Sequence, residues 1–390
     1  MRYGPARPWS FMQRKAQFCL LAAALFVASS ASAQDWLLGP FTRPVDAPVI
    51  RPNPAAVFMD PISHQPVHWE ALHTFNPAAT LTPQGSIAVL YRAEDDSGSM
   101  SIGGHTSRLG LATSTDGIHF TTLPAPVLYM DNDAQKTNEY PGGIEDPRVV
   151  QAPAGSYVVT YTQWARDRAT YTVGIATSKD LKHWTKHGPA FDAAAHDRYK
   201  NFKYKSAAIL TELRGGRLVA AQLHGKYWMY WGEIQIRLAT STDLIHWTPV
   251  LDPATYEPRI LLAARAGHFD SGFPEAGPPP LLTSHGIVLL YNAKNSSPKD
   301  TPAKALPGDP SIAAGAYSVG EALFSADDPA KLLARTDQPV FQPERPFERT
   351  GQYAAGTTFA EGLVPFHGKW FLYYGTADSF VGVATAPMKP

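Results

Sequence analysis

The ten-residue stretch LATSTDGIHF at positions 111–120 recurs as IATSKDLKHW at 175–184 and as LATSTDLIHW at 238–247. The copies start 64 and then 63 residues apart, and a looser version, ALFSADDPAKL, begins at Ala322. The last apolar run, VGVATAP from Val381, repeats the opening half. Self-similarity at a long fixed period indicates an architecture built from repeated structural units.

Each copy combines a strand with a tight turn. Its apolar first half alternates as a strand does, and Ser-x-Asp favours a turn because a short side-chain oxygen can bond the backbone two residues further on. The aromatic residue that closes each copy (Phe120, Trp184 or Trp247) is expected to pack between neighbouring units. We therefore assign a structural role to the Ser-x-Asp element and to His183 and His246 within it.

Five groups of strands are predicted from the apolar runs that accompany the copies. These runs are SIAVLYRAE (86–94), SYVVTYTQWA (156–165), KYWMYWGEIQIRLA (226–239), GIVLLYNAK (286–294) and KWFLYYGTA (369–377). The 35 prolines and 30 glycines fit many short strands joined by tight turns. Without a convincing amphipathic helix, this pattern predicts an all-β fold, a five-bladed β-propeller whose last strand completes a blade begun near the N-terminus. A β-sandwich is the alternative, but sandwiches do not usually repeat at this period.

The first 33 residues are predicted to be a signal peptide. Four basic residues lie within the first fifteen, an apolar run extends from Ala16 to Val27, and Ala31-Ser32-Ala33 matches a small-x-small cleavage site. The run is too short and wrongly flanked for a membrane anchor, although an uncleaved anchor is the alternative. We therefore expect a soluble protein exported across the inner membrane to the periplasm, with residues 34–390 forming one catalytic domain.

The charge balance argues against several classes of partner. The chain has 34 Lys and Arg against 34 Asp and Glu, and removal of the leader would leave 30 against 34. A mildly acidic protein is expected neither to bind nucleic acid nor to insert into a membrane. The only cysteine, Cys19, lies in the leader. Because the sequence also has neither zinc-ligand spacing nor a phosphate-binding glycine loop, no metal or cofactor is predicted.

Polar residues end the predicted apolar strands at corresponding places. They are Arg92 with Glu94, Asp95 and Asp96, then Asp146 with Arg148, then Glu233, Glu275 and Asp378. For a lone acid, a solvated turn carboxylate is the ordinary explanation. Strand ends at one mouth of a propeller point into a central channel, so the recurrence predicts a shared funnel whose carboxylates suit glycoside chemistry.

The run GGIEDPR at 142–148 places two acids and an arginine at the start of a strand. Proline disfavours the α region for the residue before it, so Asp146 is expected to be extended. Adjacent strand residues face opposite ways, so only one of the two carboxylates should reach the pocket. We choose Asp146, and we expect Glu145 to face the wall and to pair with Arg148.

Three aromatic residues of one run, Trp228, Tyr230 and Trp231, are candidates for stacking on sugar rings. Alternate positions on a strand must face inward, so core packing is the competing interpretation for these side chains. The sequence leaves both interpretations open.

An ordered set of motifs resembles glycoside hydrolase family 130. The motifs are YRAEDDSG (91–98), GGIEDPRVV (142–150), the Ser-x-Asp repeats, EAGPPPLLTSHGIVLLYN (275–292), YSVGEALFSADDP (317–329) and LYYGTAD (372–378). The resemblance implies a five-bladed propeller that acts on β-mannosides, as a phosphorylase or, in one subgroup, as a β-1,2-mannosidase that uses water. It maps Asp146 onto the general acid, and Arg92 and Asp378 onto residues that hold the mannose. The further candidates for substrate binding are Asp95, Arg148, Lys205, Asn292 and Tyr317.

Two departures from the family pattern concern phosphate. Family phosphorylases bind the anion with basic residues, of which one follows the GKY strand and another is the His of a YHG motif. In this chain those places hold Glu233 and the neutral Asn292, and Lys205 remains from the basic cluster. Glu233 and Glu275 resemble the paired glutamates of the hydrolytic subgroup.

These features predict an inverting hydrolase acting on a mannose-containing oligosaccharide. Asp146, kept protonated, would supply the proton to the departing oxygen through the sugar's 3-hydroxyl, as the family precedent implies. Glu233, Glu275 or both would activate water on the opposite face. The alternatives are a phosphate-dependent mannoside phosphorylase, an arabinan- or fructan-directed hydrolase, whose acid triad is not found in the usual order, and a non-catalytic glycan-binding propeller.

Overall fold

The computed structural model describes residues 1, 4, 35–100, 103–192, 198–199, 202–298 and 306–389. The predicted signal peptide, with Cys19, lies almost entirely outside the described residues. The chain divides into two compact units, Met1–Leu37 and Leu38–Pro390, and the fold below is that of the second. In the described part of the chain, no helix is long and apolar enough to cross a membrane.

The second unit is almost entirely β-structure in the residues that are described. The helical segments there are the four-residue α2 (Lys136–Glu139) and two 3-10 turns, η1 (Arg166–Arg168) and η2 (Pro346–Arg349). A two-stranded hairpin, β1 (Phe58–Met59) with β2 (Pro66–Val67), precedes the remaining strands. The all-β prediction is thereby confirmed.

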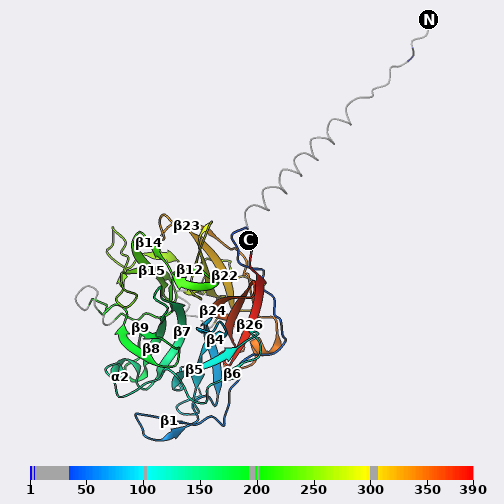
Figure 1. The fold of residues 1–390 in the computed structure, drawn as a ribbon. Coiled ribbons are helices and arrows are strands. Elements are labelled where there is room, and N and C mark those ends of the chain that lie inside the picture. The colour runs from blue at the N-terminus through cyan, green and yellow to red at the C-terminus, as the bar shows by residue number, and fades with distance from the viewer. Residues whose placement is uncertain are drawn as a thin grey trace. The chain divides into compact units, whose positions relative to one another are not determined.

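The remaining strands form sheets of 15, 6 and 3 strands, and Figure 1 shows them in chain order by colour. Along the chain we divide them into five successive groups of mainly antiparallel pairs. Group 1 comprises β3 (His73–Leu81), β4 (Ile87–Glu94), β5 (Ser107–Ser114) and β6 (Thr121–Thr122). Group 2 comprises β7 (Gly143–Gln151), β8 (Tyr157–Ala165), β9 (Thr170–Ser178) and β10 (Trp184–Pro189). Group 3 comprises β11 (Ala207–Ile209), β12 (Thr211–Arg214), β13 (Arg217–Ala220), β14 (Gln222–Leu223), β15 (Lys226–Trp231), β16 (Ile236–Ser241), β17 (Thr248–Pro249) and β18 (Ile260–Leu262). It contributes β12 and β13 to the largest sheet and its other strands to the six-stranded sheet. Group 4 comprises β19 (Phe273–Ala276), β20 (Leu281–Thr283), β21 (Gly286–Lys294), β22 (Tyr317–Phe324) and β23 (Leu332–Arg335), and group 5 comprises β24 (Phe359–Phe366), β25 (Lys369–Thr376) and β26 (Phe380–Pro387).

Each group contacts the next, and the last contacts the first. β3 contacts β7, β7 contacts β11, β15 contacts β19, β22 contacts β24, and β24 returns to β3. The segment before β1 pairs with the final strand, through antiparallel bridges from Thr42 to Thr385 and from Ile50 to Val381. An N-terminal segment therefore lies along the edge of group 5, as the sequence predicts.

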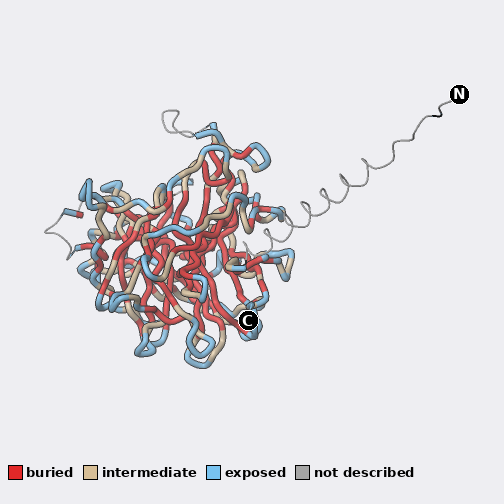
Figure 2. Tube along the Cα trace, turned by 90° about the horizontal axis from the view of Figure 1, so that it is seen from above, coloured by how far each residue is buried: buried red, intermediate tan, exposed pale blue. Residues whose placement is uncertain are grey.

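Apolar side chains fill the spaces between groups 1 and 2, 2 and 3, 3 and 4, and 5 and 1. Four buried clusters each draw on two groups, and Figure 2 shows the strands buried and the connecting loops exposed. Phe120 packs against the cluster of groups 5 and 1, Trp184 against that of groups 1 and 2, and Trp247 lies within that of groups 2 and 3. The predicted packing of the repeat aromatics between units is confirmed.

The Ser-x-Asp turns have the same hydrogen bonds in all three copies. In the copy at 178–184, Ser178 Oγ accepts from the Leu181 N–H, and Asp180 Oδ1 accepts from the N–H groups of Lys182 and His183. His183 Nδ1 lies 2.7 Å from Asp180 Oδ2, and these two side chains are largely exposed. The element is a self-contained turn, which agrees with the structural role assigned from the sequence.

A second repeat, which the sequence analysis missed, pairs a tyrosine with a glycine on the neighbouring strand. The pairs are Tyr91 with Gly110, Tyr161 with Gly174, Tyr291 with Gly320 and Tyr374 with Gly382. Each tyrosine O–H donates to a buried carboxylate, that of Glu70, Glu139, Asp270 or Glu348 respectively. A side chain on the glycine would meet the tyrosine ring, so the glycine is needed for close packing.

We expect Gly174→Ala to lower the free energy of unfolding by about 1–3 kcal/mol, because it overpacks a filled site. The added Cβ would lie 2.6 Å from Cζ of Tyr161, and the hydrogen bond to Glu139 holds that ring in place. Urea unfolding followed by tryptophan fluorescence measures the change. A loss below about 0.5 kcal/mol, the ordinary range for surface substitutions, would show that the ring can move aside.

Candidate active site

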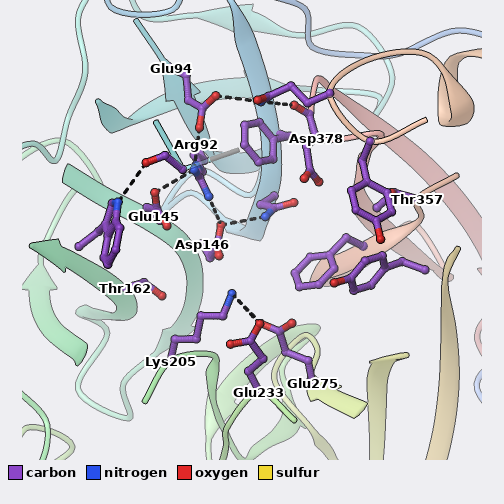
Figure 3. Close-up of a pocket in the computed structure, with 18 of the residues that line it drawn as sticks. Arg92, Glu94, Glu145, Asp146, Thr162, Lys205, Glu233, Glu275, Thr357 and Asp378 are labelled. Atoms are coloured by element: carbon purple, nitrogen blue, oxygen red, sulfur yellow. Dashed lines mark hydrogen bonds and ion pairs between the residues drawn. The ribbon is translucent and has the colours of Figure 1, made fainter. Parts of the chain in front are cut away.

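Residues from all five groups line a cavity of about 400 Å³ (Figure 3). Seven of the ten residues proposed from the sequence lie on its wall: Arg92, Asp146, Lys205, Glu233, Glu275, Tyr317 and Asp378. The other three, Asp95, Arg148 and Asn292, are buried outside the wall. The ends of strands in different groups therefore converge on one pocket, as the recurrence of polar residues predicts.

Arg92 organises one side of the cavity. It follows the apolar run of β4, and its guanidinium group lies 2.6 Å from Glu94, 2.8 Å from Glu145 and 3.1 Å from Asp146. Its Nε donates to Ser107 Oγ, and its Cζ lies 4.5 Å from the centre of the Phe75 ring. One cation is thus shared by three carboxylates, and Figure 3 shows them gathered around it.

Asp146 adopts a backbone conformation that differs from the prediction. Its φ is +49°, in the left-handed region, and the pairing of β7 with β8 shifts register between Glu145 and Arg148. This bulge breaks the alternation of the strand, so Glu145 and Asp146 both line the cavity. The expectations of an extended Asp146 and of a Glu145 facing the wall are therefore wrong. Aspartate tolerates this region better than most residues, and its contacts with Arg92 and Asn76 hold it there.

The protonation of the acid pair also differs from the prediction. Burial raises the pKa of Asp146, but Arg92, Lys205 and Arg148 outweigh it and lower that pKa to about 2. Burial and the neighbouring Asp146 raise the pKa of Glu145 to about 7, against the opposing effect of Arg92. When the pair holds one proton, the order of the two pKa values therefore places it on Glu145, whereas the sequence analysis placed it on Asp146.

Arg148 pairs with Glu361 of β24 rather than with Glu145. Its guanidinium group lies 2.9 Å from the Glu361 carboxylate, and both side chains are buried. The same group donates to the backbone carbonyls of Asp146, Ala276 and Gly277. Arg148 thus joins the strand that carries Asp146 to the residues that follow Glu275, and it supports the site from behind.

We expect Arg148→Met to lower the free energy of unfolding by about 1–3 kcal/mol, because it leaves the buried carboxyl group of Glu361, whose pKa burial raises well above its ordinary value, without its partner. Adding Glu361→Leu should restore part of that loss, since the double variant no longer buries this unpaired polar group. Urea unfolding of the two single variants and of the double variant completes the cycle. If the losses of stability in the two single variants add up to the loss in the double variant, Arg148 and Glu361 do not stabilise each other.

Lys205 and two glutamates form the opposite side of the cavity. Lys205 Nζ lies 3.4 Å from Glu233 and 3.6 Å from Glu275, and Ser206 Oγ donates to Glu275. Burial raises the pKa of Glu275 to about 7; Lys205 opposes this rise and Glu233 adds to it. Figure 3 shows Asp146 on one side of the Lys205 ammonium group and the two glutamates on the other.

Asp378 and Tyr317 complete the charged and hydroxyl-bearing wall. Asp378 lies in the turn between β25 and β26 with φ +51°, and burial raises its pKa to about 6 although Arg92 opposes the change. Tyr317 begins β22, and its ring contacts those of Tyr353 and Phe359 edge to face. Both residues therefore lie on the cavity wall, as the sequence analysis predicts.

Asp95 and Asn292 have structural roles. Asp95 forms a buried ion pair of 2.7 Å with Arg108 and accepts from the Ser97 N–H. Asn292 donates to the Ala360 carbonyl and accepts from the Ala360 N–H, so it ties group 4 to group 5. The prediction that these side chains bind substrate does not match their surroundings, because their polar atoms are already paired within the protein.

The aromatic wall differs from the set considered in the sequence analysis. Trp231 is buried in the core and Tyr230 donates to the Pro329 carbonyl, so core packing is the correct interpretation for these two residues. Trp228 donates to the Leu223 carbonyl and is not part of the cavity wall. The aromatic residues on the wall are Phe75, Trp164, Tyr171, Tyr317, Tyr353 and Phe359. They lie on four different groups, and no local sequence pattern links them.

The comparisons with known proteins agree on one family. The model of the family described as beta-1,4-mannooligosaccharide phosphorylase, glycoside hydrolase family 130, matches residues 48–389. A 1,2-beta-oligomannan phosphorylase from Thermoanaerobacter sp. (strain X514) is 31% identical over 325 residues, which are 82% of this chain and 92% of that protein.

Two solved structures are more similar still. A putative glycosidase from Bacteroides thetaiotaomicron is 48% identical, with a TM-score of 0.86 over 90% of this chain and 98% of that chain. The second is 49% identical, with a TM-score of 0.85 over 91% and 98% of the two chains. It comes from work reporting that this family of mannoside phosphorylases contains glycoside hydrolases that target β-1,2-mannosidic linkages in Candida mannan. This chain belongs to glycoside hydrolase family 130.

Proposed function

We propose that the protein is an inverting β-1,2-mannosidase, which transfers mannose to water. The observation that carries the proposal is the pair of glutamates, Glu233 and Glu275, on the cavity wall opposite Asp146. We also propose that the five groups close into a five-bladed propeller around this cavity, and that the chain is exported to the periplasm.

Charge is the argument against phosphate as the attacking group. The described residues of the wall include six acids, Glu94, Glu145, Asp146, Glu233, Glu275 and Asp378, but only two cations, Arg92 and Lys205. Arg92 already pairs with three of the acids and Lys205 with two others. Each like-charge contact at ~4 Å costs about 4 kcal/mol at an effective dielectric near 20. A phosphate dianion beside Glu233 and Glu275 would therefore be strongly disfavoured, whereas a water molecule would not.

Different carboxylates act as base and as acid in the inverting displacement. Glu275 takes a proton from water as the water oxygen attacks C1 of the mannose, and the C1–O bond to the leaving sugar breaks. Asp146 supplies the proton that reaches the departing oxygen through the 3-hydroxyl. Because its neighbouring cations lower the pKa of Asp146, it must gain this proton when substrate binds. Glu145, whose pKa is raised to about 7, is the neighbour that shares Arg92 with it and can hold the proton.

The relatives support both this proposal and a second candidate. The work on hydrolases of β-1,2-mannosidic linkages concerns a protein 49% identical to this chain. A phosphorylase is favoured by the family description and by the 31% identical oligomannan phosphorylase, and the retained Lys205 is compatible with it. The greater identity and the two glutamates favour hydrolysis.

The direct test is turnover of β-1,2-mannobiose in phosphate-free buffer. We expect mannose release at a rate that does not rise when phosphate is added. Strict dependence on phosphate, with mannose 1-phosphate as product, would establish the phosphorylase instead. If neither condition gives cleavage, the protein is a glycan-binding relative, and binding of the disaccharide should then be measurable by calorimetry.

The rate is expected to have a bell-shaped pH dependence with its maximum near pH 7. Glu275 must be ionised to act as a base, so a pKa of about 7 makes kcat/KM fall as the pH drops below that value. The acid pair must hold one proton, so the pKa of about 7 on Glu145 makes kcat/KM fall at higher pH. Glu145→Gln should change the alkaline limb and leave the acid limb in place. An unchanged alkaline limb would show that Glu145 does not supply the proton to Asp146.

A further inference from the structure

Two histidines and a glutamate meet beside the catalytic cavity. His73 begins β3, Glu94 ends β4, and His105 lies two residues before β5. One ligand atom from each of the three lies within 4.8 Å of the others, and His105 and Glu94 are fully buried. Glu94 follows His73 by 21 residues and His105 follows Glu94 by 11 residues, so no short sequence motif indicates the cluster.

The tautomer of His105 is fixed by its surroundings. Its Nδ1 lies 2.6 Å from the Ser97 carbonyl oxygen, a group that can only accept, so Nδ1 carries the proton. Nε2 is therefore a lone-pair acceptor, and it is buried without a hydrogen-bond partner. A histidine that donates one ring N–H to a carbonyl while its other nitrogen stays free has the arrangement found in metal-binding histidines.

His73 provides a second unpaired nitrogen. Its Nδ1 is also buried without a hydrogen-bond partner, and the two imidazole centroids are 6.2 Å apart. Leaving two buried ring nitrogens unpaired costs about 1–3 kcal/mol for each. A cation shared by both nitrogens and by the Glu94 carboxylate would remove that cost.

We propose that His73, Glu94 and His105 form a binding site for a divalent transition-metal ion, with Zn²⁺ as the best match to two imidazole nitrogens and one carboxylate oxygen. Three protein ligands leave a fourth position for water from the cavity. Ligand atoms around tetrahedral zinc lie about 3.3 Å apart, given bonds of about 2.0–2.1 Å, so the side chains must move inward on binding.

Arg92 is the charged group that opposes the ion. It pairs with one oxygen of Glu94 at 2.6 Å, and the other oxygen accepts from Gln352 Nε2 at 3.0 Å. Gln352 is neutral and lies at the partly buried edge, so its amide can give up this oxygen to the ion. A metal there would fix Glu94, and through it Arg92, and would tie His105 to the wall of the cavity.

The test uses the untagged full-length protein, stripped with a chelator and then titrated with Zn²⁺ by calorimetry. We expect one ion per chain, an anomalous scattering peak between the three side chains at the zinc edge, and ~100-fold or greater weakening in His105→Ala. The last figure follows because loss of an outer partner alone costs about 10–100-fold. His119→Ala is the matched control, since His119 is an exposed histidine of a Ser-x-Asp turn and should leave binding unchanged.

Several results would overturn the proposal. They are the absence of one-to-one binding by the wild-type protein, equal affinity in His105→Ala and in the control, and an anomalous peak elsewhere. If His105→Ala does not fold, His73→Ala provides the second variant. The position of the anomalous peak in wild-type crystals shows whether these three side chains bind the ion, without the need for either variant. Calorimetry and anomalous scattering measure metal binding directly, so the outcome does not depend on whether the enzyme is a hydrolase or a phosphorylase.

Discussion

Asp146→Asn is expected to lower kcat on β-1,2-mannobiose by about 10²–10⁴-fold, the usual contribution of a general acid. Asparagine keeps the size of the side chain and can still bond Arg92 or Asn76, but it cannot deliver a proton. KM should change little, because the sugar-binding side chains around it remain. Initial rates on the unactivated disaccharide, measured by quantifying released mannose, provide the value.

Two controls separate the acid role from general damage to the fold. A mannoside with a nitrophenolate leaving group needs less protonation, so the loss caused by Asp146→Asn should be much smaller on that substrate. Asp116→Asn changes an exposed carboxylate in a Ser-x-Asp turn and should leave kcat unchanged. If Asp146→Asn were as active as the parent on the disaccharide, Asp146 would not be the acid.

Glu275→Gln is expected to cause a loss of similar size, about 10²–10⁴-fold in kcat, because it removes the base that activates water. Glu275 is the more buried of the two glutamates, and its raised pKa of about 7 places it near the pH at which a base works best. Azide attacks without a base, so added azide should restore part of the rate and give the inverted mannosyl azide.

Glu233→Gln distinguishes the roles of the two glutamates. Glu233 raises the pKa of Glu275, so its replacement should lower that pKa and move the acid limb of the pH profile to lower pH. We expect a smaller loss of kcat than in Glu275→Gln. If azide rescues Glu233→Gln but not Glu275→Gln, the roles are reversed and Glu233 is the base.

The repeated units could be predicted from the sequence because their signals are local. The Ser-x-Asp turn is held by hydrogen bonds within seven residues, so its spacing alone shows where each strand ends. The packing of the closing aromatics Phe120, Trp184 and Trp247 between groups could also be predicted, because each aromatic follows its turn at a fixed offset. The pairing of an N-terminal segment with β26 followed from the incomplete last unit.

The arrangement around Asp146 could not be predicted, because distant residues determine it. Arg92 lies 54 positions earlier in the chain, and Glu361, the partner of Arg148, lies in another group. A register shift turned Glu145 into the cavity, and a rule based on strict strand alternation cannot foresee a bulge. Asn76 Nδ2 donates to Asp146 Oδ1 at 2.8 Å. The sequence contained one indication of this residue that was overlooked, because Asn76 and Pro77 interrupt the apolar run of β3.

The central claim is that the negatively charged wall near Glu233 and Glu275 admits water and excludes phosphate. It is tested most directly by the products formed from β-1,2-mannobiose in saturating phosphate, followed from the first minutes by proton and phosphorus NMR. We predict that α-mannose appears first and that no mannose 1-phosphate forms. Accumulation of α-mannose 1-phosphate in place of free mannose would contradict the account.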